Sequence, residues 1–122
     1  ISNEILDRIV EAADLSPSST VAEVGPGLGV VTTELLQRTG RVIAVEIDEN
    51  LCRHLEERFG DRENLNLVCN DILKISPREI LDAGDAEQPY TLVGNLPYYI
   101  TAPILRHFLE SDCQPPHLVI ML

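Results

Sequence analysis

The chain has few basic residues, no tryptophan and no apolar run long enough to cross a membrane. Nine Lys and Arg against twenty Asp and Glu give a formal net charge of −11 over 122 residues. This acidic excess excludes a simple electrostatic clamp for nucleic acid, and it disfavours binding to a membrane surface. No charged-then-apolar signal peptide opens the sequence. We therefore expect a cytoplasmic protein that does not bind membranes.

Cysteine and histidine are also sparse. Cys52, Cys69 and Cys113 are odd in number and show no C-x-x-C spacing, which argues against a disulfide framework and favours a reducing compartment. The three histidines are too widely separated to have the spacing of joint metal ligands. No spacing suggests a nucleophile beside a base. We expect neither a metal site nor covalent catalysis.

The composition is that of one globular domain, with 44% hydrophobic and 24% charged residues. Short apolar runs alternate with segments of helical periodicity, which is typical of βαβ units and a parallel sheet. The predicted strands span residues 20–24, 41–46, 65–69, 90–93 and 118–122. Helices are predicted over 3–13, 31–37, 49–59 and 77–81, and a further helix is expected to use Thr101 as its cap, with Pro103 in its first turn.

This alternation predicts an open, doubly wound, Rossmann-like parallel sheet. Such sheets bind ligands past the carboxyl ends of their strands, at the point where the strand order reverses. The chain opens at Ile1 and stops inside an apolar run, although a buried strand needs neighbours or a cover for its edge. We therefore expect it to be a piece of a longer protein.

A glycine cluster, Glu23-x-Gly25-x-Gly27-x-Gly29, follows the first predicted strand. Glycines let the backbone adopt positive φ and let a ligand approach closely, while the next helix presents its N–H groups to that ligand. Val30 occupies the position where the dinucleotide pattern G-x-G-x-x-G requires glycine, which disfavours a nucleotide-dependent oxidoreductase. An ordinary glycine-rich turn is the alternative interpretation.

Acidic residues follow the next two predicted strands. Glu46 ends the second strand, where a carboxylate can accept hydrogen bonds from both hydroxyls of a ribose and would repel a 2′-phosphate. Asp71 follows the third strand and could accept a hydrogen bond from the exocyclic amine of adenine. The alternatives are a solvated strand-end acid for Glu46 and a local turn residue for Asp71.

Asn95-Leu96-Pro97-Tyr98, after the fourth strand, is the most specific local signal. The Asn95 amide oxygen and a backbone carbonyl, held together by a proline turn, present two acceptors to one amino group. Tyr98 beside them can stack on a planar ring. Two acceptors can orient a conjugated amino nitrogen toward an electrophilic methyl group and stabilise the charge that develops. The alternative is a proline loop that packs Tyr98 into the core.

Two other aromatic residues, Tyr99 and Phe108, are expected to be core or wall residues and not ring stackers.

Together, these sites resemble the ribosomal RNA adenine N6,N6-dimethyltransferases, the KsgA-like family. The resemblance covers nearly all of the chain, and the matching stretches span residues 21–29, 45–48, 70–71 and 94–103. It implies a class I methyltransferase fold, a Rossmann-like open parallel sheet that is here truncated to strands one to five with their flanking helices. The cofactor implied is S-adenosylmethionine, lying over the glycine turn.

The resemblance also implies a role for each cofactor-site residue. Glu23 and the backbone of Gly25, Gly27 and Gly29 would face the methionine part of S-adenosylmethionine. The ribose hydroxyls, the adenine ring and the adenine amine would be held by Glu46, Ile47 and Asp71, in that order. Asn95 is counted among the cofactor-site residues as well.

For the target base, the resemblance implies that Asn95 and the Leu96 carbonyl hold the amino nitrogen, with Pro97 shaping the turn and Tyr98 stacking on the ring. The family methylates two adjacent adenines near the 3′ end of small-subunit rRNA, twice each. The expected partner is therefore small-subunit rRNA or the immature small ribosomal subunit.

The chain departs from the family pattern at its ends. An amino-terminal segment that helps close the cofactor site, the later strands and a carboxy-terminal helical domain would lie outside residues 1–122. We expect these parts to carry the basic surface, and we expect residues 1–122 alone to bind cofactor weakly and methylate little or no rRNA. Two alternatives remain: a resistance-type methyltransferase of large-subunit rRNA, and a non-catalytic ribosome-assembly or transcription-factor module.

Overall fold

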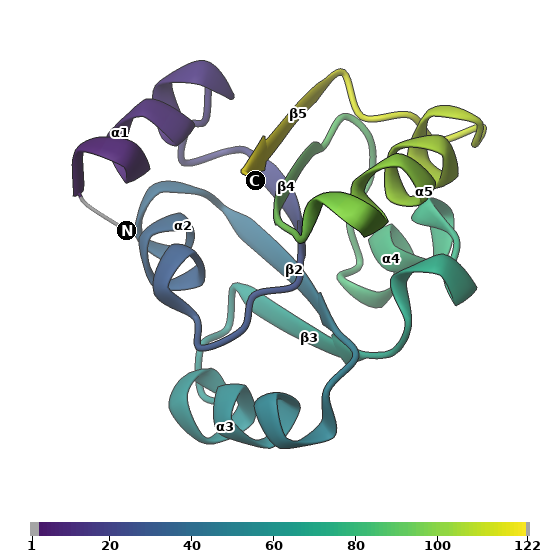
Figure 1. Ribbon diagram of the computed structural model, residues 1–122. Helices are drawn as coiled ribbons and strands as arrows, with labels where there is room; N and C mark the ends of the chain where they lie inside the picture. Colours follow the sequence, from purple (N-terminus) through teal and green to yellow (C-terminus); the bar gives the residue numbers. More distant parts are fainter. Residues whose placement is uncertain (1–2, 122) are drawn as a thin grey trace.

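A sheet of five parallel strands lies at the centre of the described chain (Figure 1). The structure is a computed structural model, and it describes residues 3–121. The strands are β1 (Thr20–Val24), β2 (Arg41–Glu46), β3 (Leu65–Cys69), β4 (Thr91–Asn95) and β5 (His117–Met121). They lie in the order β3-β2-β1-β4-β5, and each adjacent pair is parallel. The strand order therefore reverses between β1 and β4, which is where such a sheet binds ligands.

Two groups of helices cover the two faces of this sheet (Figure 1). One group comprises α1 (Asn3–Ala12), α2 (Val30–Arg38) and α3 (Glu49–Phe59), and the other comprises η1 (Ile72–Lys74), α4 (Pro77–Ala83) and α5 (Tyr98–Leu109). Side chains alternate along each strand, so Val21 faces the first group while Ala22 faces the second. The sheet is thus buried on both faces, as parallel sheets generally are.

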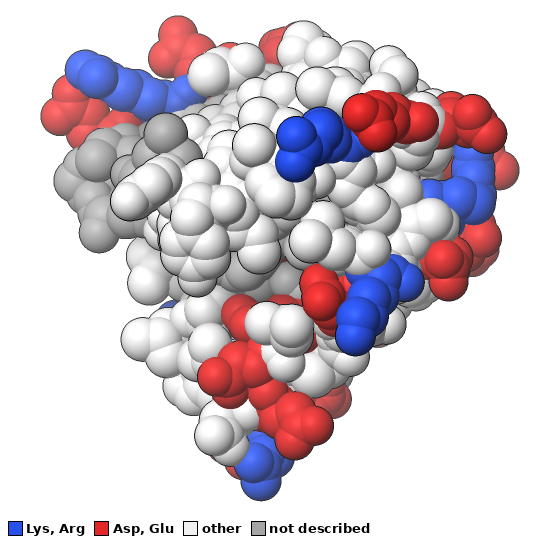
Figure 2. Space-filling view, turned by 45° about the vertical axis from the view of Figure 1, so that its right-hand side comes forward, with Lys and Arg blue, Asp and Glu red and all other residues white. Residues whose placement is uncertain are grey.

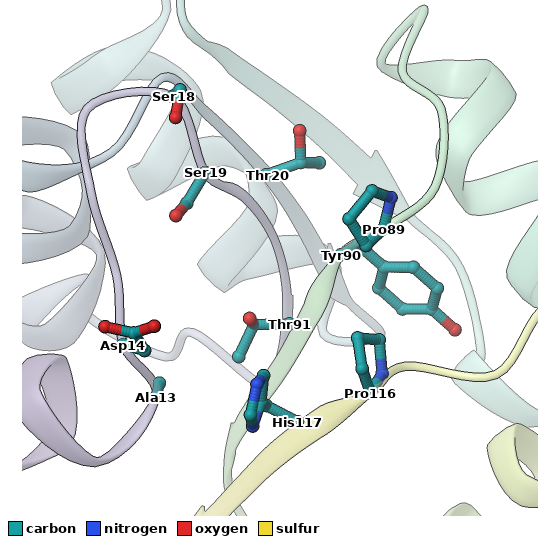
Figure 3. A pocket seen from close by; sticks show the side chains of 10 residues that line it. All are labelled: Ala13, Asp14, Ser18, Ser19, Thr20, Pro89, Tyr90, Thr91, Pro116 and His117. Atoms are coloured by element: carbon teal, nitrogen blue, oxygen red, sulfur yellow. The ribbon is translucent and has the colours of Figure 1, made fainter.

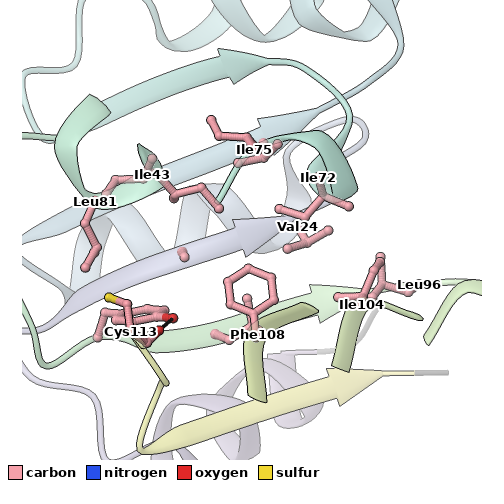
Figure 4. Packing of buried hydrophobic residues seen from close by; sticks show 14 residues of the cluster. Val24, Ile43, Ile72, Ile75, Leu81, Leu96, Ile104, Phe108 and Cys113 are labelled. Carbon is pink, nitrogen blue, oxygen red and sulfur yellow. Dashed lines mark hydrogen bonds between the residues drawn. The ribbon is translucent and has the colours of Figure 1, made fainter. Parts of the chain in front are cut away.

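The core on the α5 side ends beneath the carboxyl edge of the sheet. Figure 4 shows Val24, Ile72, Leu96 and Ile104 gathered at that end, while Phe108 points from α5 toward the centre of the cluster. Phe108 is fully buried, as the sequence predicts. The four gathered side chains come from β1, η1, the segment after β4, and α5. Their packing therefore ties together the segments that border the site.

The local signals in the sequence account for most element ends. Asp48 caps α3, because its side chain accepts hydrogen bonds from two N–H groups of the first turn. Ser76 and Glu79 form a complete capping box at the start of α4. The predicted bounds of β1, β2, β3 and α3 are confirmed, and the predicted end of α1 lies one residue beyond the observed one.

The predicted start of the last helix is wrong, because α5 begins at Tyr98 and not after a cap at Thr101. Pro97 precedes the helix, and its carbonyl accepts hydrogen bonds from the Ile100 N–H at 3.1 Å and the Thr101 hydroxyl at 3.2 Å. The hydrogen bonds of the helix thus begin two residues after β4. The Thr101 hydroxyl donates to a carbonyl of the preceding turn, as threonine side chains inside helices do. Pro103 consequently lies inside the helix.

The cysteine spacing argued against a disulfide framework, but the structure contains one disulfide. Cys52 and Cys69 are joined by a disulfide, with their Cα atoms 6.0 Å apart. The parallel register places Cys69 beside Glu46 at the end of β2, and α3 begins shortly after that same strand end. This proximity arises from strand pairing, which the spacing of cysteines along the chain does not reveal. Cys113 is free and buried.

No helix within residues 3–121 is both long enough and apolar enough to cross a membrane. Within the same residues, no three His, Cys, Asp or Glu side chains gather in an arrangement that could hold a metal ion.

Candidate functional site

Two adjoining hollows lie at the carboxyl ends of the strands. The first has a volume of about 250 Å³ and lies between the ends of β2 and β4, and the second has a volume of about 370 Å³ and lies at the glycine turn after β1. Gly25 and Asn95 line both hollows, so the hollows meet at these two residues. Glu46 lines the first hollow together with Asn95, although 49 positions separate them, counting from 46 to 95. The strand order thus assembles the expected residues at one edge of the sheet.

The glycine turn has a backbone that other residues rarely adopt. Gly25, Gly27 and Gly29 have φ values of 69°, 59° and 89°. A Cβ atom on Gly29 would lie 2.6 Å from Cε2 of Phe59, so both conformation and space require glycine there. A Cβ on Gly27 would meet no atom within 4 Å, which means that the backbone at Gly27 borders open space. A ligand can therefore approach the turn closely at this point.

Arg58 of α3 holds the glycine turn from outside. Its Nη1 donates to the Leu28 carbonyl at 2.8 Å, and its Nη2 donates to the Thr33 hydroxyl at 3.3 Å. The guanidinium carbon also lies 4.9 Å from the ring centroid of Phe59, within the range of a cation–π contact. Sequence reasoning missed Arg58, because no local motif connects it with a turn 30 residues earlier.

Glu46 is the last residue of β2 and is buried. Its Oε1 accepts a hydrogen bond from the Gly27 N–H at 3.1 Å, and its Oε2 accepts one from the Asp48 N–H at 3.1 Å. Since each carboxylate oxygen has two lone pairs, each can accept a further donor from the hollow. The carboxylate is thus held between the glycine turn and the start of α3, with capacity for a ligand.

Glu23 lies on β1 and lines the second hollow. Its side chain is 3% exposed, and its Oε1 accepts a hydrogen bond from the Thr32 hydroxyl at 2.5 Å. Burial raises the pKa of Glu23 to about 7, the Thr32 hydrogen bond opposes that rise, and the charge of Glu46 adds to it. A carboxyl group that titrates near neutral pH beside a hollow is a candidate for a functional site. Sequence reasoning missed Thr32.

Among the described residues, Asp71, Asn70 and Ile47 differ in their relation to the first hollow: Asn70 and Ile47 line it, and Asp71 does not. Asp71 caps η1, because its Oδ1 accepts a hydrogen bond from the Leu73 N–H at 2.9 Å. That geometry is the local turn which the sequence left open. Asn70 lines the hollow, and Asp71 is not among the lining residues within the described chain. Ile47 also lines the hollow and is 64% exposed, so it offers an apolar surface to a planar ring.

Asn95 is the last residue of β4, which runs two residues beyond its predicted end. The extension follows from pairing with β5, because Asn95 stands opposite Met121 in the parallel register. The Leu96 N–H then donates to the Met121 carbonyl at 3.1 Å, which fixes the chain direction just after the strand. Asn95 is exposed, whereas the Leu96 side chain is buried. The turn is thus anchored while the carboxamide remains accessible.

The aromatic residues after this turn differ in position. Pro97 lines the first hollow and precedes α5, whose first residue is Tyr98. Tyr98 is 80% exposed, so it is not packed into the core, and within residues 3–121 it is not among the residues that line either hollow. Tyr99 is 75% exposed and lines the first hollow, so it is a wall residue.

A third hollow, of about 420 Å³, lies at the opposite edge of the sheet (Figure 3). It surrounds the first residues of β1, β4 and β5, where Thr91 and His117 lie side by side in the parallel register. Neither the glycine turn nor Glu46 contributes to its lining. Because ligands of parallel sheets bind at the carboxyl ends of the strands, we place the candidate site at the first two hollows.

The surface beside the site has an apolar character. Leu28, Ile47, Tyr98 and Tyr99 are each at least 60% exposed. Figure 2 shows the molecule with the α4 and α5 side turned forward, and a broad area of that face carries no charge while charged residues lie mainly toward its edges. Exposed apolar side chains beside a ligand-sized hollow are typical of a surface that receives a partner or substrate.

A family model described as ribosomal RNA adenine dimethylase matches residues 1–122. The chain belongs to this family. Ribosomal RNA small subunit methyltransferase A of Dehalococcoides mccartyi is 53% identical over 122 residues, which are 100% of this chain and 41% of that relative. The chain thus spans less than half the length of this relative.

Solved structures show the same architecture. The 23S rRNA methyltransferase ErmE matches with a TM-score of 0.80 at 32% identity, over 100% of this chain and 47% of that chain. A dimethyladenosine transferase from Plasmodium falciparum matches in fold with a TM-score of 0.76 at 24% identity, over 98% of this chain and 41% of that chain. The predicted class I methyltransferase sheet is confirmed.

Proposed function

We propose that this chain is the S-adenosylmethionine-binding core of an enzyme that dimethylates N6 of adjacent adenines in small-subunit rRNA. Membership in the ribosomal RNA adenine dimethylase family supports the reaction, and the name of the 53% identical relative supports the small subunit as its source of rRNA. The observation that carries the proposal is the position of Asn95, which lines the hollow of Glu46 and the hollow of the glycine turn at once. A methyl donor and a target amine could therefore meet beside one carboxamide.

The charges of the site fit S-adenosylmethionine better than a dinucleotide. Glu23 borders the hollow at the glycine turn, so in its ionised form it favours a ligand with a positive group there and opposes a pyrophosphate. The Gly27 N–H, which could otherwise help to bind a phosphate, already donates to Glu46. Open space beside Gly27 leaves room for a ligand against the turn. When bound, this cofactor supplies an electrophilic methyl group on a positively charged sulfur.

Glu46, Ile47 and Glu23 have roles that their positions support. Glu46 would accept hydrogen bonds from the ribose hydroxyls, and Ile47 would cover one face of the adenine ring. Glu23, in its ionised form, would hold the ammonium of the methionine part. Asp71 stays a candidate for the adenine amine through the oxygen that does not cap η1, with Asn70 beside it in the lining.

Asn95 and the Leu96 carbonyl would hold the target amino group. Accepting its two N–H groups directs the nitrogen toward the methyl group and stabilises the positive charge that develops as the new bond forms. After the first transfer the nitrogen keeps one N–H, so one acceptor still holds it for the second. Pro97 shapes the turn, and the 80% exposed ring of Tyr98 is available to stack on an extruded base.

The partner in this proposal is small-subunit rRNA or an immature small ribosomal subunit. The net charge of −11 makes the described domain a poor binder of RNA phosphates on its own. We therefore assign the basic RNA-binding surface to the part of the protein that corresponds to the remaining length of the relatives, and we assign the adenine pocket to this chain.

The test is methyl transfer by the intact protein to small ribosomal subunits that lack these methyl groups. Asn95→Ala should lower turnover by about 100-fold or more while leaving S-adenosylhomocysteine affinity within about threefold, because it removes an acceptor needed mainly in the transition state. Glu46→Ala should instead weaken cofactor binding. Gln37→Ala, which removes an exposed carboxamide on α2, is the matched control and should behave like the wild type.

The alternatives give different results in the same experiment. Methylation of large-subunit rRNA alone would favour the resistance-type enzyme. Cofactor binding without transfer to either rRNA would favour a non-catalytic module. Full turnover by Asn95→Ala would refute the proposed role of that carboxamide.

A further inference from the structure

The disulfide between Cys52 and Cys69 lies behind residues that line the first hollow, because Cys69 precedes Asn70 and the Cys52 sulfur lies near the backbone of Glu46. Cys69 is the last residue of β3 and is exposed, whereas Cys52 lies in the first turns of α3 and is 7% exposed. The disulfide therefore joins the end of the edge strand β3 to the start of helix α3. Nothing in the proposed methyl transfer uses either sulfur.

Both cysteines lie beside the backbone of Glu46, which lines the first hollow. The Cys52 sulfur lies 3.3 Å from the Glu46 carbonyl oxygen, and Cys69 is the partner of Glu46 in the parallel register. The same carbonyl accepts a hydrogen bond from the Asn70 N–H at 3.0 Å. Glu46, Ile47 and Asn70 all line the hollow, so the residues adjacent to the two sulfurs form its wall.

We propose that Cys52 and Cys69 form a reversible dithiol–disulfide site that controls the shape of the cofactor hollow. This inference rests on the proposed function, because it assigns the hollow to the adenosine part of the cofactor. In the bridged state, α3 and β3 are fixed on either side of Glu46. Reduction breaks that link, and the two thiol sulfurs must move apart because they are no longer bonded. The exposed end of β3, with Asn70, then moves relative to Ile47.

The reaction partner is a low-molecular-weight disulfide in one direction and a dithiol in the other. The Cys69 thiolate, which is accessible, attacks one sulfur of the small disulfide and releases one thiol. The Cys52 thiolate then attacks Cys69 in the mixed disulfide and releases the second thiol. Two electrons pass from the protein sulfurs to the small disulfide, and the two protons of the cysteines end on the two released thiols. A dithiol reverses the same steps and leaves as its cyclic disulfide.

The test compares the intact protein after treatment with glutathione disulfide and after treatment with dithiothreitol. Alkylation and mass spectrometry should find Cys52 and Cys69 blocked in the first sample and free in the second. Titration with S-adenosylhomocysteine should show affinity at least about threefold lower after reduction, since the wall of the hollow is less ordered. Cys69→Ser should lose this response, and Cys113→Ser, which changes the buried free cysteine, should keep it.

A ligand-free measurement separates this proposal from the proposed function. Amide hydrogen exchange over residues 46–52 and 69–72 should be faster in the reduced protein than in the bridged protein, and the difference should vanish in Cys69→Ser. If exchange differs but neither form binds S-adenosylhomocysteine, the proposed function fails while the redox site stands. Free thiols after glutathione disulfide treatment, or equal exchange in both states, would overturn the redox site.

Discussion

Glu23 gives the sharpest prediction, because one substitution changes both cofactor binding and stability. Its carboxyl group is buried on β1 at the hollow of the glycine turn, where it accepts a hydrogen bond from the Thr32 hydroxyl at 2.5 Å. Burial raises its pKa from 4.5 to about 7. The perturbation is Glu23→Gln, which keeps the shape and the bond to Thr32 but removes the titration. Glu57→Gln, on the exposed side of α3, is the matched control.

The pH dependence of the folding stability follows from whether the folded or the unfolded protein binds the Glu23 proton more tightly. Because the pKa of Glu23 is raised from 4.5 to about 7, the folded protein holds this proton more tightly than the unfolded chain does. The resulting stabilisation is fully present below pH 4.5 and is lost as the pH rises through about 7. A shift of this size corresponds to a loss on the order of 3 kcal/mol. Glu23→Gln should lack this slope and, without ligand, should be more stable than the wild type at pH 8.

For binding, the ionised carboxylate is the form that can hold the ammonium of the cofactor. Wild-type affinity for S-adenosylhomocysteine should therefore rise about tenfold between pH 6 and pH 8, and binding near pH 7 should release a proton. Glu23→Gln should bind about tenfold or more weakly than the wild type at pH 8, with little dependence on pH. Calorimetry in buffers of different ionisation enthalpy measures both quantities. A pH-independent wild-type affinity, or an unchanged slope in Glu23→Gln, would refute this reasoning.

Substitutions at three further positions test the turn and the target base. Gly29→Ala should lower the free energy of unfolding by about 2–4 kcal/mol in a denaturant titration, because the φ of Gly29 is 89° and an added Cβ would lie 2.6 Å from the Phe59 ring. Unchanged stability would contradict the turn geometry. Arg58→Met should weaken S-adenosylhomocysteine binding several-fold by calorimetry, because the Leu28 carbonyl loses its anchor; wild-type affinity would show that the anchor is dispensable. Tyr98→Ala should lower kcat/KM for rRNA by about 10-fold or more in methyl-transfer assays, whereas Tyr98→Phe should keep it, because stacking needs only the ring; equal losses in both variants would argue for the hydroxyl instead.

The parts of the fold that follow from local patterns could be predicted from the sequence. The apolar run ending at Glu46 predicted β2, and Asp48 predicted the start of α3 because a carboxylate cap acts within one turn. The carboxyl ends of parallel strands share an edge, so alternation of strands and helices was enough to place Glu46 and Asn95 near each other.

The missed features depend on tertiary register. Cys69 meets Cys52 only because β3 pairs with β2 in one particular alignment, and Arg58 reaches the glycine turn only because α3 packs beside it. The start of α5 was misplaced because Thr101 is a good cap by composition, while the Pro97 carbonyl already accepts a hydrogen bond from Ile100. The disulfide and the Arg58 contact thus depend on segments far apart in the sequence, whereas the start of α5 was decided by a competing local hydrogen bond.

The most direct test of the central claim is a crystal structure of the intact protein with S-adenosylhomocysteine. The account predicts the adenosine in the hollow between Glu46 and Asn95, and the homocysteine carbon chain in the hollow of Glu23 and Gly27, with the sulfur where the two hollows meet. A ligand bound at the opposite edge of the sheet, or one whose sulfur lies out of reach of Asn95, would contradict it.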